Sequence, residues 1–135
     1  MQLGTQTASG SKSRLWTGRI VSTVAVLFLL LDGALHVMMP AQVVQAFARL
    51  GYPVSLAPTL GILEIVCVVV YVFPRTSILG AILLTGYLGG ATATQVRVGS
   101  PLFAEALFPV YIGVLIWGGL CLREDQLRVL IPLRR

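Results

Sequence analysis

Charged residues are scarce in this sequence, and cysteine and histidine are scarcer still. Of its 135 residues, 11% are charged and 56% are hydrophobic, and the mean hydropathy is +0.88. A soluble globular domain carries about 25% charged residues. This chain therefore has too little polar surface to face water, and it is predicted to be a single membrane domain.

The same scarcity excludes several kinds of site. The two cysteines, Cys67 and Cys121, form no C-x-x-C pair and fall inside apolar runs, where we interpret them as small buried residues. With one histidine, His36, and five acids, a dense metal cluster is ruled out, so no metal site is predicted. The sequence also contains no haem or flavin motif, and its Gly-rich stretch lacks the Lys-Ser/Thr of a phosphate loop.

The net charge of +5 comes from ten basic residues against five acids. These basic residues lie at the ends of apolar runs and do not form a stripe along one face. A nucleic-acid partner is therefore not expected. The lipid bilayer is the predicted partner.

Four apolar runs are long enough to cross a bilayer as helices. They are separated by Pro40, by Pro74-Arg75 and by Gly99-Ser100-Pro101. The predicted fold class is all-α, a polytopic membrane protein with an antiparallel bundle of four transmembrane helices. The spans are about 16–39, 56–73, 77–96 and 103–122, within a membrane domain over 14–123 that lies between a disordered tail over 1–13 and a basic cytoplasmic tail over 124–135.

Two segments near the first span need separate interpretation. Residues 41–52 carry apolar side chains at helical spacing but are too short to span, which predicts a short amphipathic helix between spans one and two. The first apolar run also has the length of a signal-peptide core. No small-x-small cleavage site follows it promptly, and Asp32 and His36 belong to the same helix, so a retained span is favoured.

The orientation follows from the positive charges at the span ends. With the N-terminus inside, the cytoplasmic side holds eight of the ten basic residues, and the outer side holds only Arg49 and Arg97. The chain is therefore predicted to be a multi-pass protein of the bacterial inner membrane with both termini cytoplasmic.

In this orientation the ionisable side chains within the spans gather in the outer half of the bundle. Asp32 and His36 are four residues apart and share a helix face, and Glu64 lies level with Asp32. A charge at mid-membrane costs on the order of 3 kcal/mol, and such residues normally face the bundle interior and pair. The candidate ligand-binding cluster comprises Asp32, His36, Glu64, Tyr87, Thr94, Gln95 and Arg97.

This polar cluster has two interpretations. It is either an ion-pair network that fixes the order of the helices, or a pocket that opens outward beneath the segment 41–52. A pocket would hold a small polar head or exchange a proton through Asp32, His36 or Glu64.

Small residues on span three predict close helix packing. Gly86 and Gly90 form a G-x-x-x-G pair whose face continues through Ala93. We expect this face to pack within the monomer, and homodimerisation is the second interpretation.

Five features of the sequence form a recognisable set: L-G-I-L-E at 60–64, P-R-T at 74–76, the long span-three motif from Leu79 to Thr94, Asp32 with its basic partner, and the segment 47–53. They resemble motifs of the DoxX-like family of small four-helix membrane proteins. Together they extend over nearly all of the chain except its tails.

This resemblance implies a membrane role whose reaction is not defined. The wider superfamily is similar to membrane subunits of thiosulfate–quinone oxidation and to membrane partners of sulfur-transfer and superoxide-handling enzymes, and it includes an animal assembly factor for receptor channels. The leading hypothesis is that the chain binds a small amphipathic molecule, quinone-like or lipid-like, in a redox or stress pathway with a membrane or redox protein partner. The alternatives are a non-enzymatic scaffold or assembly partner with a purely structural cluster, and a small enzyme using Asp32, His36 and Glu64 as acids and bases.

The topology can be tested directly. A reporter fused after Arg135 is expected to be active on the cytoplasmic side, because most Lys and Arg residues are placed there. Paired reporters active only in the cytoplasm or only in the periplasm measure this. A periplasmic signal would overturn the orientation and the depth assigned to the polar cluster.

Overall fold

The computed structural model describes the backbone of residues 3–130 and the side chains of residues 10–130. This part of the chain is helical and contains no strand. Its elements in order are α1 (Leu3–Met38), α2 (Ala41–Leu50), the 3-10 turn η1 (Val54–Leu56), α3 (Ala57–Val72), α4 (Ser77–Arg97), the π-helical turn η2 (Leu102–Ala106), α5 (Phe108–Arg123) and α6 (Asp125–Leu130). The four longest stretches have the length and composition of membrane spans.

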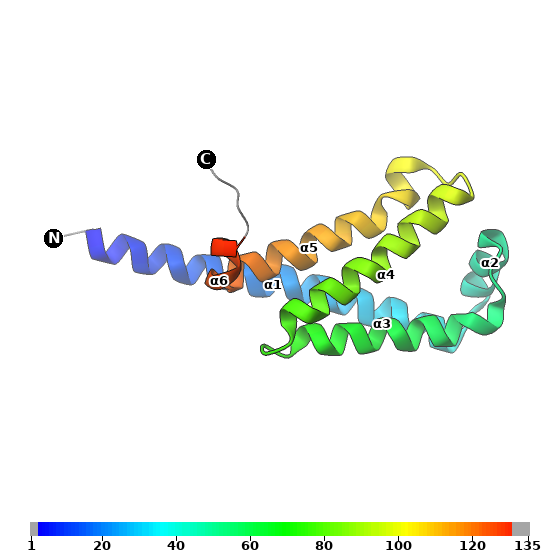
Figure 1. The fold of residues 1–135 in the computed structure, drawn as a ribbon, viewed down its shortest axis with the longest axis horizontal. Coiled ribbons are helices and arrows are strands. Elements are labelled where there is room, and N and C mark those ends of the chain that lie inside the picture. Colours follow the sequence, from blue (N-terminus) through cyan, green and yellow to red (C-terminus); the bar gives the residue numbers. More distant parts are fainter. Residues whose placement is uncertain (1–2, 131–135) are drawn as a thin grey trace.

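The four long helices form a ring in which each contacts two neighbours. Helix α1 packs against α3 and α5, and α4 packs against the same two helices from the other side. Figure 1 shows α2 lying across one end of this bundle, which we call the α2 end; the opposite end, near α6, is the termini end. The predicted four-helix membrane bundle with a short helix between spans one and two is confirmed.

Both tails contain helix. Leu3–Ser13 continues α1 towards the N-terminus, so the prediction of a disordered tail is wrong for residues 3–13. Extending an existing helix avoids the cost of nucleation, which explains how a polar segment without proline joins the span. Met1 and Gln2 lie outside the described residues.

The C-terminal tail is also partly ordered. Helix α6 folds back so that Asp125 accepts a hydrogen bond from Arg14 at 2.7 Å, and Leu127 is buried. This return of the chain was not predicted. The basic residues Arg134 and Arg135 lie outside the described part of the chain.

Proline and glycine set the breaks at the α2 end. Helix α1 ends where Met39 takes a left-handed conformation (φ 51°) before Pro40, and α2 ends at Gly51 with φ 76°. The fourth span was predicted as one helix over 103–122, but η2 interrupts it before Pro109. Pro109 has no N–H and cannot donate the hydrogen bond of a regular α-helix. The turn before it therefore takes the wider backbone hydrogen-bond spacing of a π-helix.

The termini end is tightly packed. Tyr71 is buried on α3, where its hydroxyl donates to the Ile116 carbonyl oxygen at 2.9 Å and lies 3.1 Å from the Ser22 hydroxyl. One tyrosine thus links α3 to both α1 and α5. Gly80 of α4 lies against the backbone of the same tyrosine, where any side chain would overlap it.

Two single glycines bring α1 and α3 together near the α2 end. A Cβ added at Gly61 would lie 2.6 Å from the carbonyl oxygen of Gly33 and 2.8 Å from the Cβ of His36. Small residues allow helix backbones to approach this closely in lipid. The crossing places the α1 residues beside Gly33 next to the α3 residues that follow Gly61.

The predicted packing motif on α4 has a different role. A Cβ at Gly86 or Gly90 would meet nothing within 4 Å, and Ala93 is exposed. The expectation that this face packs within the monomer is therefore wrong. The rotation of α4 turns Gly86 and Gly90 towards a cavity instead.

Alanine substitutions distinguish these two kinds of glycine. Gly61→Ala is expected to lower the free energy of unfolding by about 1–3 kcal/mol, because the added methyl overpacks the α1–α3 crossing. Gly86→Ala adds the same methyl in open space and is expected to be neutral or slightly stabilising. Unfolding in mixed micelles measures both, and equal effects at the two positions would contradict this assignment.

Candidate functional site

A fully buried acid is the centre of the candidate site. Glu64 lies on α3 with 0% of its surface exposed. The Tyr87 hydroxyl of α4 donates to Glu64 Oε2 at 3.1 Å. The other oxygen, Oε1, has no hydrogen-bond partner in the described part of the chain. A buried acceptor left unpaired is costly, so this oxygen requires an explanation.

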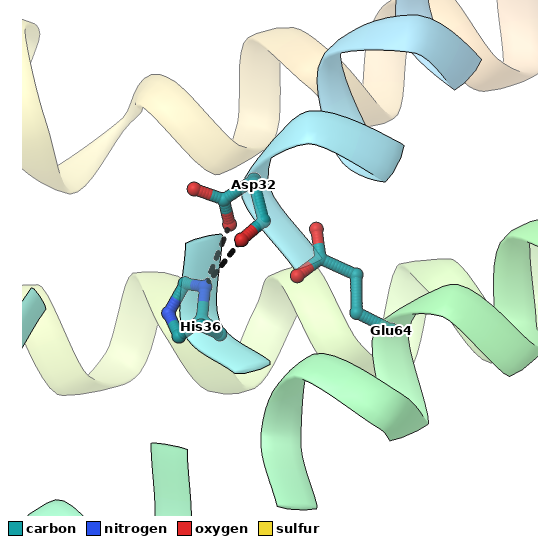
Figure 2. Close-up of side chains that lie close together, drawn as sticks. All are labelled: Asp32, His36 and Glu64. Atoms are coloured by element: carbon teal, nitrogen blue, oxygen red, sulfur yellow. Dashed lines mark hydrogen bonds and ion pairs between the residues drawn. The ribbon is translucent and has the colours of Figure 1, made fainter. Parts of the chain in front are cut away.

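Two further polar side chains of α1 face the same point. His36 Nδ1 lies 2.8 Å from the Asp32 carbonyl oxygen and 3.5 Å from Asp32 Oδ2. Figure 2 shows the Glu64 side chain directed from α3 towards these two residues of α1. One ligating atom from each of Asp32, His36 and Glu64 lies within 4.8 Å of the others. The predicted convergence of these three residues is present in the structure.

These three residues line a cavity of about 610 Å³ at the α2 end of the bundle. Most of its wall is apolar, with Phe28, Leu60, Phe108 and Ile112 contributed by three of the long helices. Known small-molecule sites have volumes of about 300–1,000 Å³ and combine apolar walls with a few polar groups. The cavity therefore has the size and the character of a ligand site.

Helix α2 covers this cavity. Its Phe47 is buried and stands edge-on to the His36 ring, with the ring centroids 5.6 Å apart. Val43 and Leu50, on the same face of α2, also line the cavity. The amphipathic pattern of this helix is explained by an apolar face that closes one side of the site.

The α4 residues Thr94 and Gln95 line the cavity, as expected of the candidate cluster. The Thr94 hydroxyl lies 3.0 Å from the Tyr52 hydroxyl, and Gln95 Oε1 accepts from Ser100 at 2.6 Å. Gly86 and Gly90 contribute bare backbone to the same wall. Without side chains at these positions, α4 leaves space for a ligand.

Arg97 was grouped with this cluster as a partner for its acids, and this expectation is wrong. Its guanidinium donates to the Leu50 carbonyl oxygen at 2.6 Å and lies over the Tyr52 ring, 5.8 Å from the centroid. Leu50 ends α2, so its carbonyl is free to accept. Arg97 thereby ties the end of α2 to α4 and does not line the cavity.

The other arginine at this end is also engaged elsewhere. Arg49 pairs with Glu105 at 2.9 Å, near the cavity rim. Among residues 10–130, no ion pair joins an arginine to Asp32 or Glu64. The polar part of the cavity wall therefore combines two carboxyl groups with one imidazole and one phenol.

Sequence reasoning missed several residues that shape the site. Tyr52, Phe47 and Gly61 were part of motifs, but no role in the site was predicted for them, and none was predicted for Gly33. A sequence signal for the glycines exists, because each lies within three residues of a membrane-embedded acid.

The fold and the cavity define a class: small four-span helical membrane proteins with a polar site at one end of the bundle. A family model described as the DoxX-like family matches residues 20–119, which include all the candidate site residues. The chain belongs to that family. No match to the chain was found among curated proteins, and none among solved structures.

The stability of matched variants tests whether Glu64 is a structural residue. Glu64→Met is expected to leave the free energy of unfolding unchanged or to raise it by about 1–3 kcal/mol, because it removes an unpaired acid from the membrane interior. Tyr71→Phe is expected to lower it by about 1 kcal/mol, because a satisfied buried hydroxyl is lost. Unfolding in mixed micelles gives both values. Destabilisation by Glu64→Met larger than that by Tyr71→Phe would identify the acid as part of the packing.

Proposed function

We propose that this protein binds a small amphipathic molecule, of a quinone-like or lipid-like class, in the cavity at the α2 end. The observation that carries the proposal is the cavity of about 610 Å³ whose wall includes a buried carboxylate oxygen, Glu64 Oε1, without a partner among the described residues. The apolar walls would hold the tail or ring of the ligand. The polar head would lie against Asp32, His36 and Glu64.

The unpaired oxygen of Glu64 supports a ligand site over a purely structural network. Tyr71 at the termini end satisfies its own hydroxyl, although Nε of Arg14 and Nε and Nη2 of Arg123 lack partners there within the described residues. Glu64 differs from these arginines because its unpaired atom lines a cavity. At the α2 end Glu64 Oε1 lacks a partner, and the nearby arginines bind other groups. Buried polar groups left incomplete are typical of sites that receive a ligand.

In the proposed orientation the site opens towards the outer face of the inner membrane. The termini end carries most of the basic residues, which favours its placement in the cytoplasm. The cavity and α2 then lie in the outer half of the bilayer. Such a protein would serve a redox or stress pathway by holding or presenting its ligand to a membrane partner.

The alternative function is that of a membrane scaffold or assembly partner. An apolar groove between α4 and α5, lined by Gly89, Gly113 and Trp117, favours it, because small residues in such a groove accommodate a neighbouring helix. In this case the groove would be the functional surface and the polar cluster would stabilise the fold.

Adjacent glycines on α4 separate the two functions. Gly90 lines the cavity and Gly89 lines the groove, and neither has a neighbour within 4 Å of an added Cβ. Gly90→Phe is expected to fill the cavity and remove at least about nine-tenths of a co-purifying amphipathic molecule, roughly a tenfold loss of occupancy. Gly89→Phe is the matched control and is expected to retain it.

Mass spectrometry of lipid extracts from the purified protein measures this retention. The wild-type protein is expected to carry one specific amphipathic molecule above the background of the bulk lipids. If the wild type carries only bulk lipid, or if both variants retain the molecule equally, the binding proposal is rejected. Loss of a partner protein in Gly89→Phe alone would instead favour the scaffold.

A further inference from the structure

One wall of the cavity carries three metal-ligating side chains close together. Atoms of Asp32, His36 and Glu64 lie within 4.8 Å of one another. Clusters of this kind are common without a metal, so a second observation is needed. It is supplied by Glu64, which is fully buried, has one oxygen without a partner and is aimed at the other two residues (Figure 2). We propose that Asp32, His36 and Glu64 bind a divalent transition-metal ion, with Zn²⁺ as the expected occupant.

Charge balance in the membrane supports a doubly charged ion. In the metal-binding form the two acids are carboxylates and the imidazole is neutral, so the three ligands together carry −2. The hydrocarbon interior disfavours that charge unless a cation accompanies it. No arginine within residues 10–130 pairs with either acid. One divalent cation would make the site neutral and would satisfy Glu64 Oε1.

The His36 ring is placed beside the acids but must exchange a hydrogen bond for the ion. In the structure Nδ1–H donates to the Asp32 carbonyl oxygen at 2.8 Å, because a carbonyl oxygen can only accept. An ion bound by Nδ1 would replace this hydrogen, which is released on binding and moves the imidazole hydrogen to Nε2. Tyr87 donates to the second oxygen of Glu64 and so holds the carboxylate in place. This is the kind of outer partner that orients metal ligands in proteins.

The mixture of one nitrogen and two oxygens selects the class of ion. Mg²⁺ and Ca²⁺ prefer sites made entirely of oxygen, whereas imidazole favours transition metals such as Zn²⁺. Zinc bonds of about 2.0–2.2 Å in a tetrahedral site require ligand atoms about 3.3–3.6 Å apart. Asp32 and His36 are only partly buried and can close the 4.8 Å separation by rotation.

A three-ligand site leaves one position open, as in catalytic zinc sites. Here this position would face the cavity, so an oxygen atom of a bound head group is its natural fourth ligand. The ion site shares its cavity with the proposed amphipathic ligand. It does not require that ligand, because the three protein side chains suffice to hold the ion.

The test uses the full-length protein in detergent after treatment with a chelator. Equilibrium dialysis against Zn²⁺ is expected to show one ion per chain, and Co²⁺ is expected to give the visible absorption of a low-symmetry site. Asp32→Asn and Glu64→Gln each remove one anionic ligand, and each is expected to weaken Zn²⁺ binding by at least about tenfold. Glu124→Gln and Asp125→Asn make the same chemical changes at the termini end and are expected to bind as the wild type does.

The proposal is overturned if the wild type binds no stoichiometric Zn²⁺, or if Asp32→Asn and Glu64→Gln bind it as tightly as the two controls. If Glu64→Gln fails to fold, the partly exposed Asp32→Asn decides the outcome. Lipid extraction from the metal-free protein separates this proposal from the preceding one. An amphipathic molecule retained without any Zn²⁺ site rejects only the metal, and Zn²⁺ binding without retention rejects only the amphipathic ligand.

Discussion

A carboxylate buried inside a membrane bundle is the constraint on which this structure depends. Glu64 has no exposed surface, and within the described residues only one of its oxygens accepts a hydrogen bond. Its position follows from the crossing of α1 and α3 at Gly33 and Gly61, because only glycine permits that approach. The same crossing brings Asp32 and His36 close to Glu64. One helix–helix contact therefore sets both the packing of α1 on α3 and the position of the polar side chains.

The two ends of the bundle differ: one is closely packed and the other encloses a cavity. At the termini end, Tyr71 joins three helices through satisfied hydrogen bonds, and Gly80 lets α4 lie directly on α3. At the α2 end the helices enclose a cavity that α2 covers. The hydrogen bond from Arg97 to the Leu50 carbonyl oxygen holds the end of α2 against α4. A packed end that supports a hollow end with polar side chains is the arrangement expected of a binding protein.

Features set by local pattern were predictable from the sequence. Apolar run length gave the four spans, and helical rise placed Asp32 level with Glu64. Features that depend on helix rotation or on chain return were not predictable. The Gly86–Gly90 pair fits packing or a cavity wall equally well, and only the rotation of α4 decides between them. Arg97 donates to the Leu50 carbonyl oxygen because α2 lies across the end of the bundle. The spacing of residues along the chain does not predict this contact.

An experimental structure of the protein taken from its native membrane, at a resolution that shows bound groups, would reveal whether the cavity holds a ligand. We expect density in the cavity that contacts Glu64 Oε1 and extends between the apolar walls of α1 and α5. A closed cavity, with both Glu64 oxygens bonded to protein side chains, would contradict this expectation and would make the polar cluster a structural network.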